Sequence, residues 1–204
     1  ATFKNTDAVT IAGAITEASG ATTLAVLNSA DAEAPSVATI SGAVTVDTIT
    51  IGATATAGSV KFSSTVEGTS TIHGGNAAVE DSLMEITDTH TGAVVLTQAG
   101  SGDAGFKTSG STALSVTGAI TATTDGDGVI TSANTNQATF AAVGTDAKKI
   151  LSVTVSSGAD AVFGAAVAAN TLTITGEATL QAADNESETI AMGASSRLII
   201  DDTL

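Results

Sequence analysis

Apolar and polar residues alternate along most of this chain, and one alternating phrase of eight residues recurs. Its common form is apolar, hydroxyl, β-branched, small, glycine, small, apolar, threonine. The copies are VTIAGAIT at 9–16, ATISGAVT at 38–45, LSVTGAIT at 114–121 and LTITGEAT at 172–179, with a looser copy, THTGAVV, at 89–95. A period of two residues is that of a half-buried strand, so the phrase predicts a strand–glycine–strand unit.

The glycines of these copies lie at intervals that agree only in part. In sequence number, the interval from Gly13 to Gly42 is 29, and that from Gly118 to Gly176 is 58, which is twice 29. The interval from Gly42 to Gly118 is 76, and that from Gly92 to Gly118 is 26. Periods of about 20 to 50 residues are typical of stacked coils. We therefore expect an all-β fold, a β-solenoid similar to a parallel β-helix with irregular coils; a β-sandwich or jelly roll is the alternative.

Two stretches depart from the alternation. The stretch 77–86 (AAVEDSLMEI) is the best helix candidate, because Val79, Leu83 and Ile86 would share one side of a helix, with a loop followed by a strand as the alternative. The Gly-, Ser- and Asp-rich stretch 98–111 predicts a loop and is the candidate linker. The phrase occurs on both sides of it, so we expect a single β-rich domain over 1–204.

Elsewhere short alternating runs predict strands, and one of them changes its apolar face. The run that begins at Val44 places apolar residues at alternate positions up to Asp47 and at the opposite positions beyond it. A β-bulge or bend shifts the inward face of a strand by one residue. The sequence therefore predicts a bend or bulge near Asp47.

Composition narrows the classes of function. The chain has 6 Lys and Arg against 21 Asp and Glu, a net charge of -15, whereas nucleic acids and anionic membranes require a basic surface. There is no cysteine, which excludes disulfides and cysteine-bearing zinc sites. No run approaches the roughly 20 apolar residues that span a bilayer. We expect neither a nucleic-acid partner nor membrane insertion.

The composition resembles that of bacterial and archaeal cell-surface proteins: S-layer subunits, passenger regions of adhesins and autotransporters, and extracellular filaments built from strands. Those proteins are rich in Thr, Ala, Gly and Val, acidic, free of Cys and poor in Lys, as this chain is. The resemblance implies an extracellular or cell-surface structural protein.

One motif points to a metal. Asp125 and Asp127 begin the segment DGDGVI at 125–130, which matches the middle of a calcium loop of the form D-x-D-G-x-I. A complete loop needs further acidic ligands where Thr123 and Asn134 stand. Asp125 and Asp127 are therefore candidate calcium ligands if another loop completes the site, and a plain Asp-Gly tight turn or hairpin is the alternative.

Other chemistry is sparse. His73 and His90, with Glu85 and Asp88, are a candidate metal or acid–base group, and surface histidines are the alternative. The motifs of serine hydrolases, zinc proteases and phosphate-binding loops are absent. Thr-x-Thr pairs such as Thr48 and Thr50 are too scattered along the chain to predict an ice-binding ladder.

We therefore expect no enzyme but a structural subunit that polymerises with other copies of itself through strands or coil ends, as an extracellular filament or surface layer. The alternative is a glycan- or surface-binding module, such as an adhesin segment or a viral fibre or decoration protein. A secreted β-helix enzyme acting on polysaccharides would need carboxylates or an arginine clustered on one face, and Arg197 is the only arginine.

Overall fold

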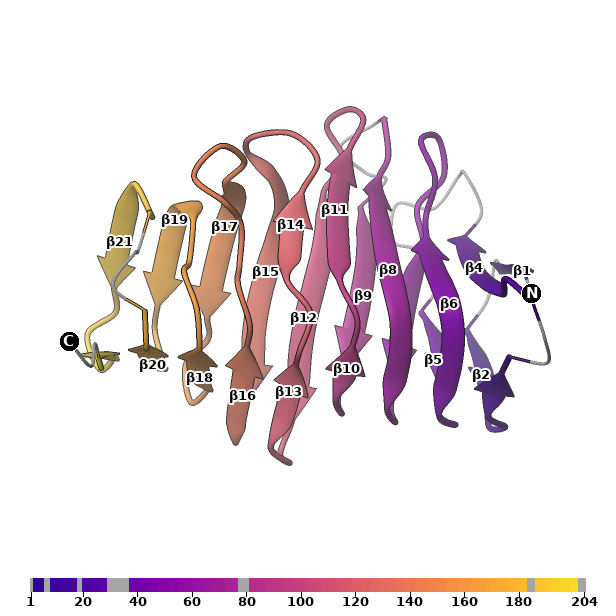
Figure 1. Ribbon diagram of the computed structural model, residues 1–204, viewed down its shortest axis with the longest axis horizontal. Coiled ribbons are helices and arrows are strands. Elements are labelled where there is room, and N and C mark those ends of the chain that lie inside the picture. Colours follow the sequence, from indigo (N-terminus) through magenta and orange to yellow (C-terminus); the bar gives the residue numbers. More distant parts are fainter. Residues whose placement is uncertain are drawn as a thin grey trace.

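The chain forms a β-solenoid of about seven turns built from parallel strands. The computed structural model describes residues 2–5, 8–17, 20–28, 37–76, 81–182 and 186–201. Two long sheets run side by side from the N-terminal to the C-terminal end of the solenoid (Figure 1). The predicted β-solenoid is confirmed, and every ladder between described strands is parallel, which a β-sandwich or jelly roll would not give.

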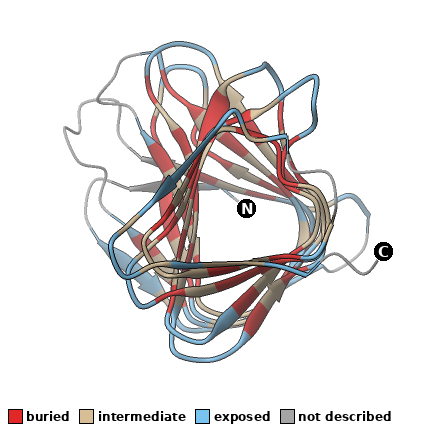
Figure 2. Cartoon of the chain, turned by 90° about the vertical axis from the view of Figure 1, so that its left-hand side faces the viewer, coloured by how far each residue is buried: buried red, intermediate tan, exposed pale blue. Residues whose placement is uncertain are grey.

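A cross-section of the solenoid is three-sided (Figure 2), and each side is a face of stacked strands. Face 1 is the nine-stranded sheet, in which each strand pairs with its counterparts in the preceding and following turns. Its strands are β2 (Val9–Ile11), β5 (Ala38–Ile40), β7 (Ser59–Phe62), β9 (Ser82–Ile86), β12 (Ala104–Gly110), β15 (Asp127–Asn134), β17 (Ile150–Val155), β19 (Ala169–Ile174) and β21 (Thr189–Met192).

The larger sheet bends to form faces 2 and 3, and β6 (Val44–Ile51) and β8 (Val66–Gly74) contribute to both. Face 2 also contains β3 (Ile15–Thr16), β10 (His90–Thr91), β13 (Leu114–Val116), β16 (Gln137–Phe140), β18 (Asp160–Phe163), β20 (Glu177–Leu180) and β22 (Arg197–Ile200). Face 3 also contains β1 (Thr2–Asn5), β4 (Thr23–Asn28), β11 (Val94–Gln98) and β14 (Ile120–Ala122). In the described chain, no helix is long and apolar enough to cross a membrane.

Apolar side chains form continuous rows inside the solenoid because equivalent residues of successive turns are paired. One row on face 1 is Val9, Ala38, Val60, Met84, Phe106, Ile130, Val153, Leu172 and Ile190. Phe106 is 1% exposed, and the rings of Phe140 and Phe163 stack with centroids 5.2 Å apart. Burying one large aliphatic or Phe side chain stabilises the fold by about 1.5–3 kcal/mol, so these rows are the core.

Outward side chains form matching rows, as the alternation predicts. One outward row of face 1 lies between two inward rows. Its members are Thr10, Thr39, Lys61, Glu85, Lys107, Thr131, Thr154, Thr173 and Ala191. Polar groups therefore face water while their chain neighbours fill the core.

The bend or bulge predicted near Asp47 is confirmed, because the pairing register of β6 with β8 shifts between Thr45 and Thr48. It lies where the chain turns from face 2 to face 3. The shift allows Val44 and Val46 on one side and Ile49 and Ile51 on the other to point into the same interior.

Two predictions for the middle of the chain need correction. Residues 82–86 form the strand β9, so the helix is wrong and the strand of the alternative is confirmed; residues 77–80 of that candidate lie outside the described residues. The predicted loop 98–111 contains β12, which pairs with β9 and β15 and buries Phe106. Pairing on both sides supplies backbone hydrogen bonds and burial that outweigh weak local strand propensity.

The recurring phrase is confirmed as a strand–glycine–strand unit, but it occurs at two different corners. Gly13, Gly42 and Gly176 lie between face 1 and face 2, whereas Gly92 and Gly118 lie between face 2 and face 3. Gly118 and Gly176 therefore lie at different corners. The interval between them is twice that between Gly13 and Gly42 only by accident. The turns also differ in length: one runs from position 9 to its partner at position 38, and a later one only from 171 to 189.

The corner glycines lie so close that a side chain does not fit between turns. A Cβ at Gly42 would overlap the carbonyl group of Gly13 in the preceding turn, whereas a Cβ at Gly13 would meet nothing within 4 Å. We predict that Gly42→Ala destabilises the protein by about 1–3 kcal/mol and that Gly13→Ala changes its stability by less than about 0.5 kcal/mol. Denaturant unfolding followed by circular dichroism measures both; equal effects would contradict this packing.

Candidate functional site

The DGDG segment forms the tight turn that leads from β14 on face 3 into β15 on face 1, which begins at Asp127. Gly126 and Gly128 have φ of 81° and 82°, a region that glycine adopts without strain. Asp127 is 7% exposed, and its Oδ2 accepts hydrogen bonds from Thr123 Oγ1 at 3.0 Å and from the backbone of Thr124 at 3.0 Å and of Gln98 at 3.3 Å. The tight turn that was the alternative is therefore present, but the hairpin is wrong, because β15 pairs in parallel with β12 and β17.

Asp125 lies at the exposed side of the same turn. Its Oδ1 accepts a hydrogen bond of 2.9 Å from the backbone of Lys149 in the next turn. Both carboxylates therefore accept hydrogen bonds from other parts of the same chain. Among the described residues, no three acidic, histidine or cysteine side chains are grouped so as to hold a metal ion. Calcium binding by Asp125 and Asp127 stays a prediction.

His90 lies in the core and not on the surface. It is fully buried, its Nε2 lies 2.9 Å from Ser70 Oγ, and its ring meets Phe106 edge-on at 6.2 Å between centroids. Its Nδ1 is buried without a hydrogen-bond partner. Burial lowers the pKa of His90 to about 4, although backbone groups of Gly92 and His90 oppose the shift.

The structure does not bring the two histidines and their acidic neighbours together. His73 is half-buried on the outer side of face 3, and burial lowers its pKa. Glu85 projects outward from face 1, while His90 points into the core from face 2. The proposed metal or acid–base group of His73, His90, Glu85 and Asp88 is therefore not assembled.

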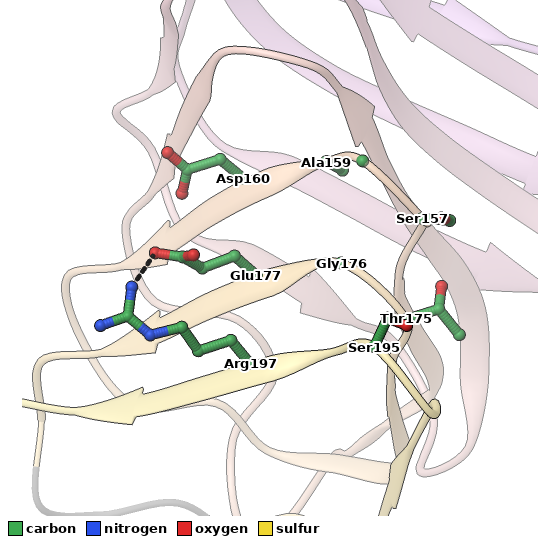
Figure 3. Close-up of a pocket in the computed structure, with 9 residues that line it drawn as sticks. Ser157, Ala159, Asp160, Thr175, Gly176, Glu177, Ser195 and Arg197 are labelled. Atoms are coloured by element: carbon green, nitrogen blue, oxygen red, sulfur yellow. Dashed lines mark hydrogen bonds and ion pairs between the residues drawn. The ribbon is translucent and has the colours of Figure 1, made fainter.

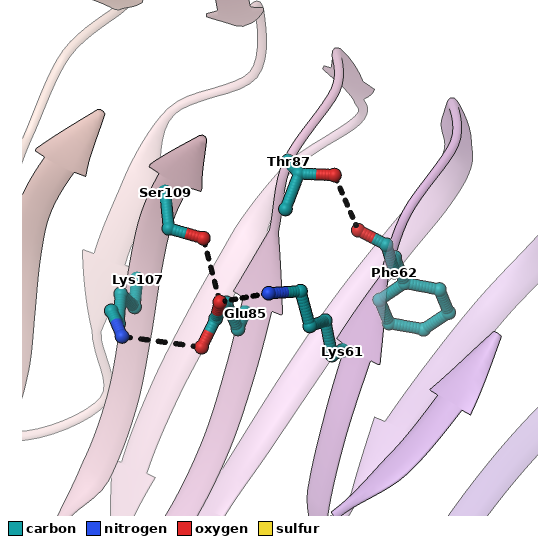
Figure 4. Close-up of polar contacts among 6 residues, drawn as sticks. All are labelled: Lys61, Phe62, Glu85, Thr87, Lys107 and Ser109. Atoms are coloured by element: carbon teal, nitrogen blue, oxygen red, sulfur yellow. Dashed lines mark hydrogen bonds and ion pairs between the residues drawn. The ribbon is translucent and has the colours of Figure 1, made fainter. Parts of the chain in front are cut away.

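An ion-pair cluster instead forms around Glu85 on face 1 (Figure 4). Lys61 Nζ lies 2.8 Å from Glu85 Oε1, Lys107 Nζ lies 3.2 Å from Oε2, and Ser109 Oγ donates to Oε1 at 2.6 Å. Burial raises the pKa of Glu85, but the hydrogen bonds from Lys61 and Ser109 and the charge of Lys107 outweigh it and leave the pKa below its ordinary value. The cluster joins three successive turns, and both carboxylate oxygens of Glu85 already accept hydrogen bonds within it.

An open pocket of about 360 Å³ lies at the corner of faces 1 and 2 near the C-terminal end (Figure 3). Asp160, Glu177 and Arg197 occupy paired positions of β18, β20 and β22, and Arg197 Nη1 lies 3.2 Å from Glu177 Oε1. Burial raises the pKa of Asp160, and the charge of Glu177 raises it further. The hydroxyl residues Ser157, Thr175 and Ser195 complete the lining.

Sequence reasoning missed both clusters because their members are distant in sequence. Lys61, Glu85 and Lys107 are separated by 24 and 22 residues, and each is a lone charge in its own strand. Only the turn length at that point of the solenoid would have placed them in one row.

Comparison with known proteins finds no match among protein families, curated proteins or solved structures.

The buried His90 makes stability depend on pH. Its pKa is about 4 in the folded chain and near 6.5 when unfolded, so the folded state resists protonation and loses stability as the pH falls from about 6.5 to 4. We predict that the wild type loses about 3 kcal/mol relative to His90→Leu over this range. Urea unfolding of both proteins at several pH values measures the difference. Parallel stability curves would show that His90 is not responsible.

Proposed function

We propose that the chain is a structural subunit of an extracellular filament or surface layer, whose copies stack end to end by strand addition. The proposal rests on the two ends of the described solenoid, where the core rows are uncovered. Val9 at the N-terminal end is 38% exposed, and Ile190 and Met192 at the C-terminal end are 42% and 48% exposed. These side chains belong to the same inward rows that are buried in the middle turns.

The two ends match in register. Val9 and Ile190 are the first and last members of one inward row, and Ile11 and Met192 are the first and last members of the next. Pairing β21 of one copy with β2 of another would therefore continue both rows and keep Ala191 and Thr10 outside. A head-to-tail contact of this kind does not close on itself and generates a filament.

The faces at the two ends are complementary as well. The last described turn has β21 on face 1 and β22 on face 2, and the first described strand, β1, lies on face 3. In a head-to-tail stack, β1 of the next copy would occupy face 3 of that last turn and complete its three sides. Strand addition of this type supplies backbone hydrogen bonds along the whole edge.

A charge in the open core row tests the stacking. We predict that Ile190→Lys raises the critical concentration for filament formation at least about tenfold, equivalent to about 1.4 kcal/mol per junction, because the new ammonium would be desolvated at the contact. Thr189→Lys on the same strand is the matched control, since Thr189 lies in an outward row. Sedimentation and negative-stain electron microscopy provide the measurement. A monomeric wild type, or equal assembly by the two variants, would contradict the proposal.

A second candidate function is glycan binding at the corner pocket. The observation that favours it is a pocket of about 360 Å³ whose lining includes two carboxylates, a guanidinium and three hydroxyl residues. Carboxylates and guanidinium groups form strong hydrogen bonds with hydroxyl groups, and a pocket with two acids and one base disfavours polyanions. The same residues supply the clustered carboxylates and the arginine that a secreted enzyme acting on polysaccharides would need. The lining offers no aromatic ring on which a sugar would stack.

A glycan array followed by titration of any hit tests this candidate. We expect Glu177→Ala to weaken binding at least tenfold because it removes one acceptor and the ion-pair partner of Arg197. Glu67→Ala, at an exposed position of face 2, is the control and should bind as the wild type does. Failure of the wild type to bind any glycan, or equal binding by both variants, would eliminate the candidate.

A further inference from the structure

The three faces of the solenoid differ in charge. Face 1 carries the Lys61, Glu85 and Lys107 row, and face 2 carries Glu67, Asp160, Glu177 and Arg197. Between β4 and β14, the outward positions on the strands of face 3 carry no carboxylate, lysine or arginine. They are Thr23, Ala25, Leu27, Thr48, Thr50, Thr69, Thr71, His73, Val95, Thr97 and Thr121. Charged residues flank this stretch: Lys4 of β1 stands at the register position beside Leu27, and Asp47 at the bulge accepts a hydrogen bond from the backbone of Thr22. Burial lowers the pKa of His73, so this histidine is neutral at pH 7.

The side chains of face 3 are aligned in rows, although the other Thr-x-Thr pairs of the sequence, such as Thr171 and Thr173 on face 1, lie elsewhere. Thr48 and Thr50 pair with Thr69 and Thr71 in the next turn. The longer row runs from Ala25 through Thr50, Thr71 and Val95 to Thr121. Its members are small or β-branched, and Thr23 Oγ1 and Thr48 Oγ1 are hydrogen-bonded at 2.9 Å. Side chains of this size allow two sheets to approach to about 10 Å.

We infer that face 3 is a lateral contact surface for face 3 of a second copy. A protein with a net charge of -15 repels its own copies, and the repulsion is weakest where two stretches without charged side chains meet, as the stretch from β4 to β14 on face 3 is. The charges of the other two faces would have to be paired or desolvated in any equally close contact. In a two-fold contact the centre of the patch meets itself, and Thr71 occupies the middle of the long row.

The area of face 3 determines when this contact forms. Five strands at about 4.8 Å and four to five residues per strand at about 3.3 Å give about 350 Å². A stable pair of free proteins buries about 800 Å² on each partner, so isolated subunits meet only transiently. In a filament the contact is repeated at every subunit, and the repeats add. Lateral pairing of filaments therefore rests on the end-to-end assembly proposed above, whereas the transient encounter of subunits does not.

Single cysteines report the encounter without requiring filaments, because the chain has no cysteine of its own. Under mild oxidation of concentrated subunits carrying Ile190→Lys, we expect Thr71→Cys to form disulfide-linked dimers at least tenfold faster than Thr139→Cys. Thr139 is an equally half-buried outward residue on face 2. Adding Thr121→Glu should reduce the Thr71→Cys rate to that of the control. Equal rates for the two cysteines, or no effect of the glutamate, would overturn the inference.

Electron microscopy separates this inference from the proposed function. Wild-type filaments should lie side by side, and Thr121→Glu filaments should stay single with unchanged length. Loss of filaments in Thr121→Glu would assign face 3 to the end-to-end contact and overturn the lateral one. Absence of wild-type filaments would refute the proposed end-to-end assembly. It would not decide the lateral contact of face 3, which the rates of cysteine cross-linking test separately. Inhibition of ice recrystallisation by the wild type but not by Thr121→Glu, with equal cysteine rates, would assign face 3 to ice instead.

Discussion

Parallel pairing between equivalent residues of successive turns is the interaction on which the rest of the structure depends. It satisfies the backbone hydrogen bonds and also sets the position of every side chain relative to the next turn. Because the pairing is in register, a row that begins with Val9 stays inside as far as Ile190. A shift of one residue would exchange inside and outside for a whole strand. The bulge between Thr45 and Thr48 is placed where the chain turns a corner, and both sides of it keep their apolar residues in the core.

The same constraint explains the glycines and the variable length of the turns. Corner residues of adjacent turns touch, so Gly42 and Gly118 lie against Gly13 and Gly92 with no room for a side chain. The connections between strands differ in length, so the long first turn and the shorter last ones coexist in one solenoid. The interior tolerates some polar groups: Thr108 Oγ1 donates to Ser132 Oγ at 3.3 Å, and His90 stays neutral beside Ser70.

The candidate sites could be predicted less well than the fold. Asp125 and Asp127 are neighbours in sequence, so their turn could be recognised, but only the structure shows that Thr123, Thr124 and Gln98 occupy Asp127 Oδ2. The Glu85 cluster, the corner pocket and the neutral face 3 each combine residues from several turns. Their spacing depends on turn lengths that vary with the loops, and a local pattern carries no information about those lengths.

The sequence by itself determined the strand period, the division of residues into inward and outward sets and the corner glycines, and it favoured a stacked, parallel fold over a β-sandwich. These properties depend on local sterics and on the two-residue alternation of side chains, which any paired strand expresses. Only the tertiary structure decided which strands are neighbours. It turned the polar stretch at 104–110 and the helix-like stretch at 82–86 into central strands, because burial and pairing on both sides outweigh local preference. It also decided which charges meet and that the stretch of face 3 from β4 to β14 has none, since these follow from register between turns and not from position along the chain.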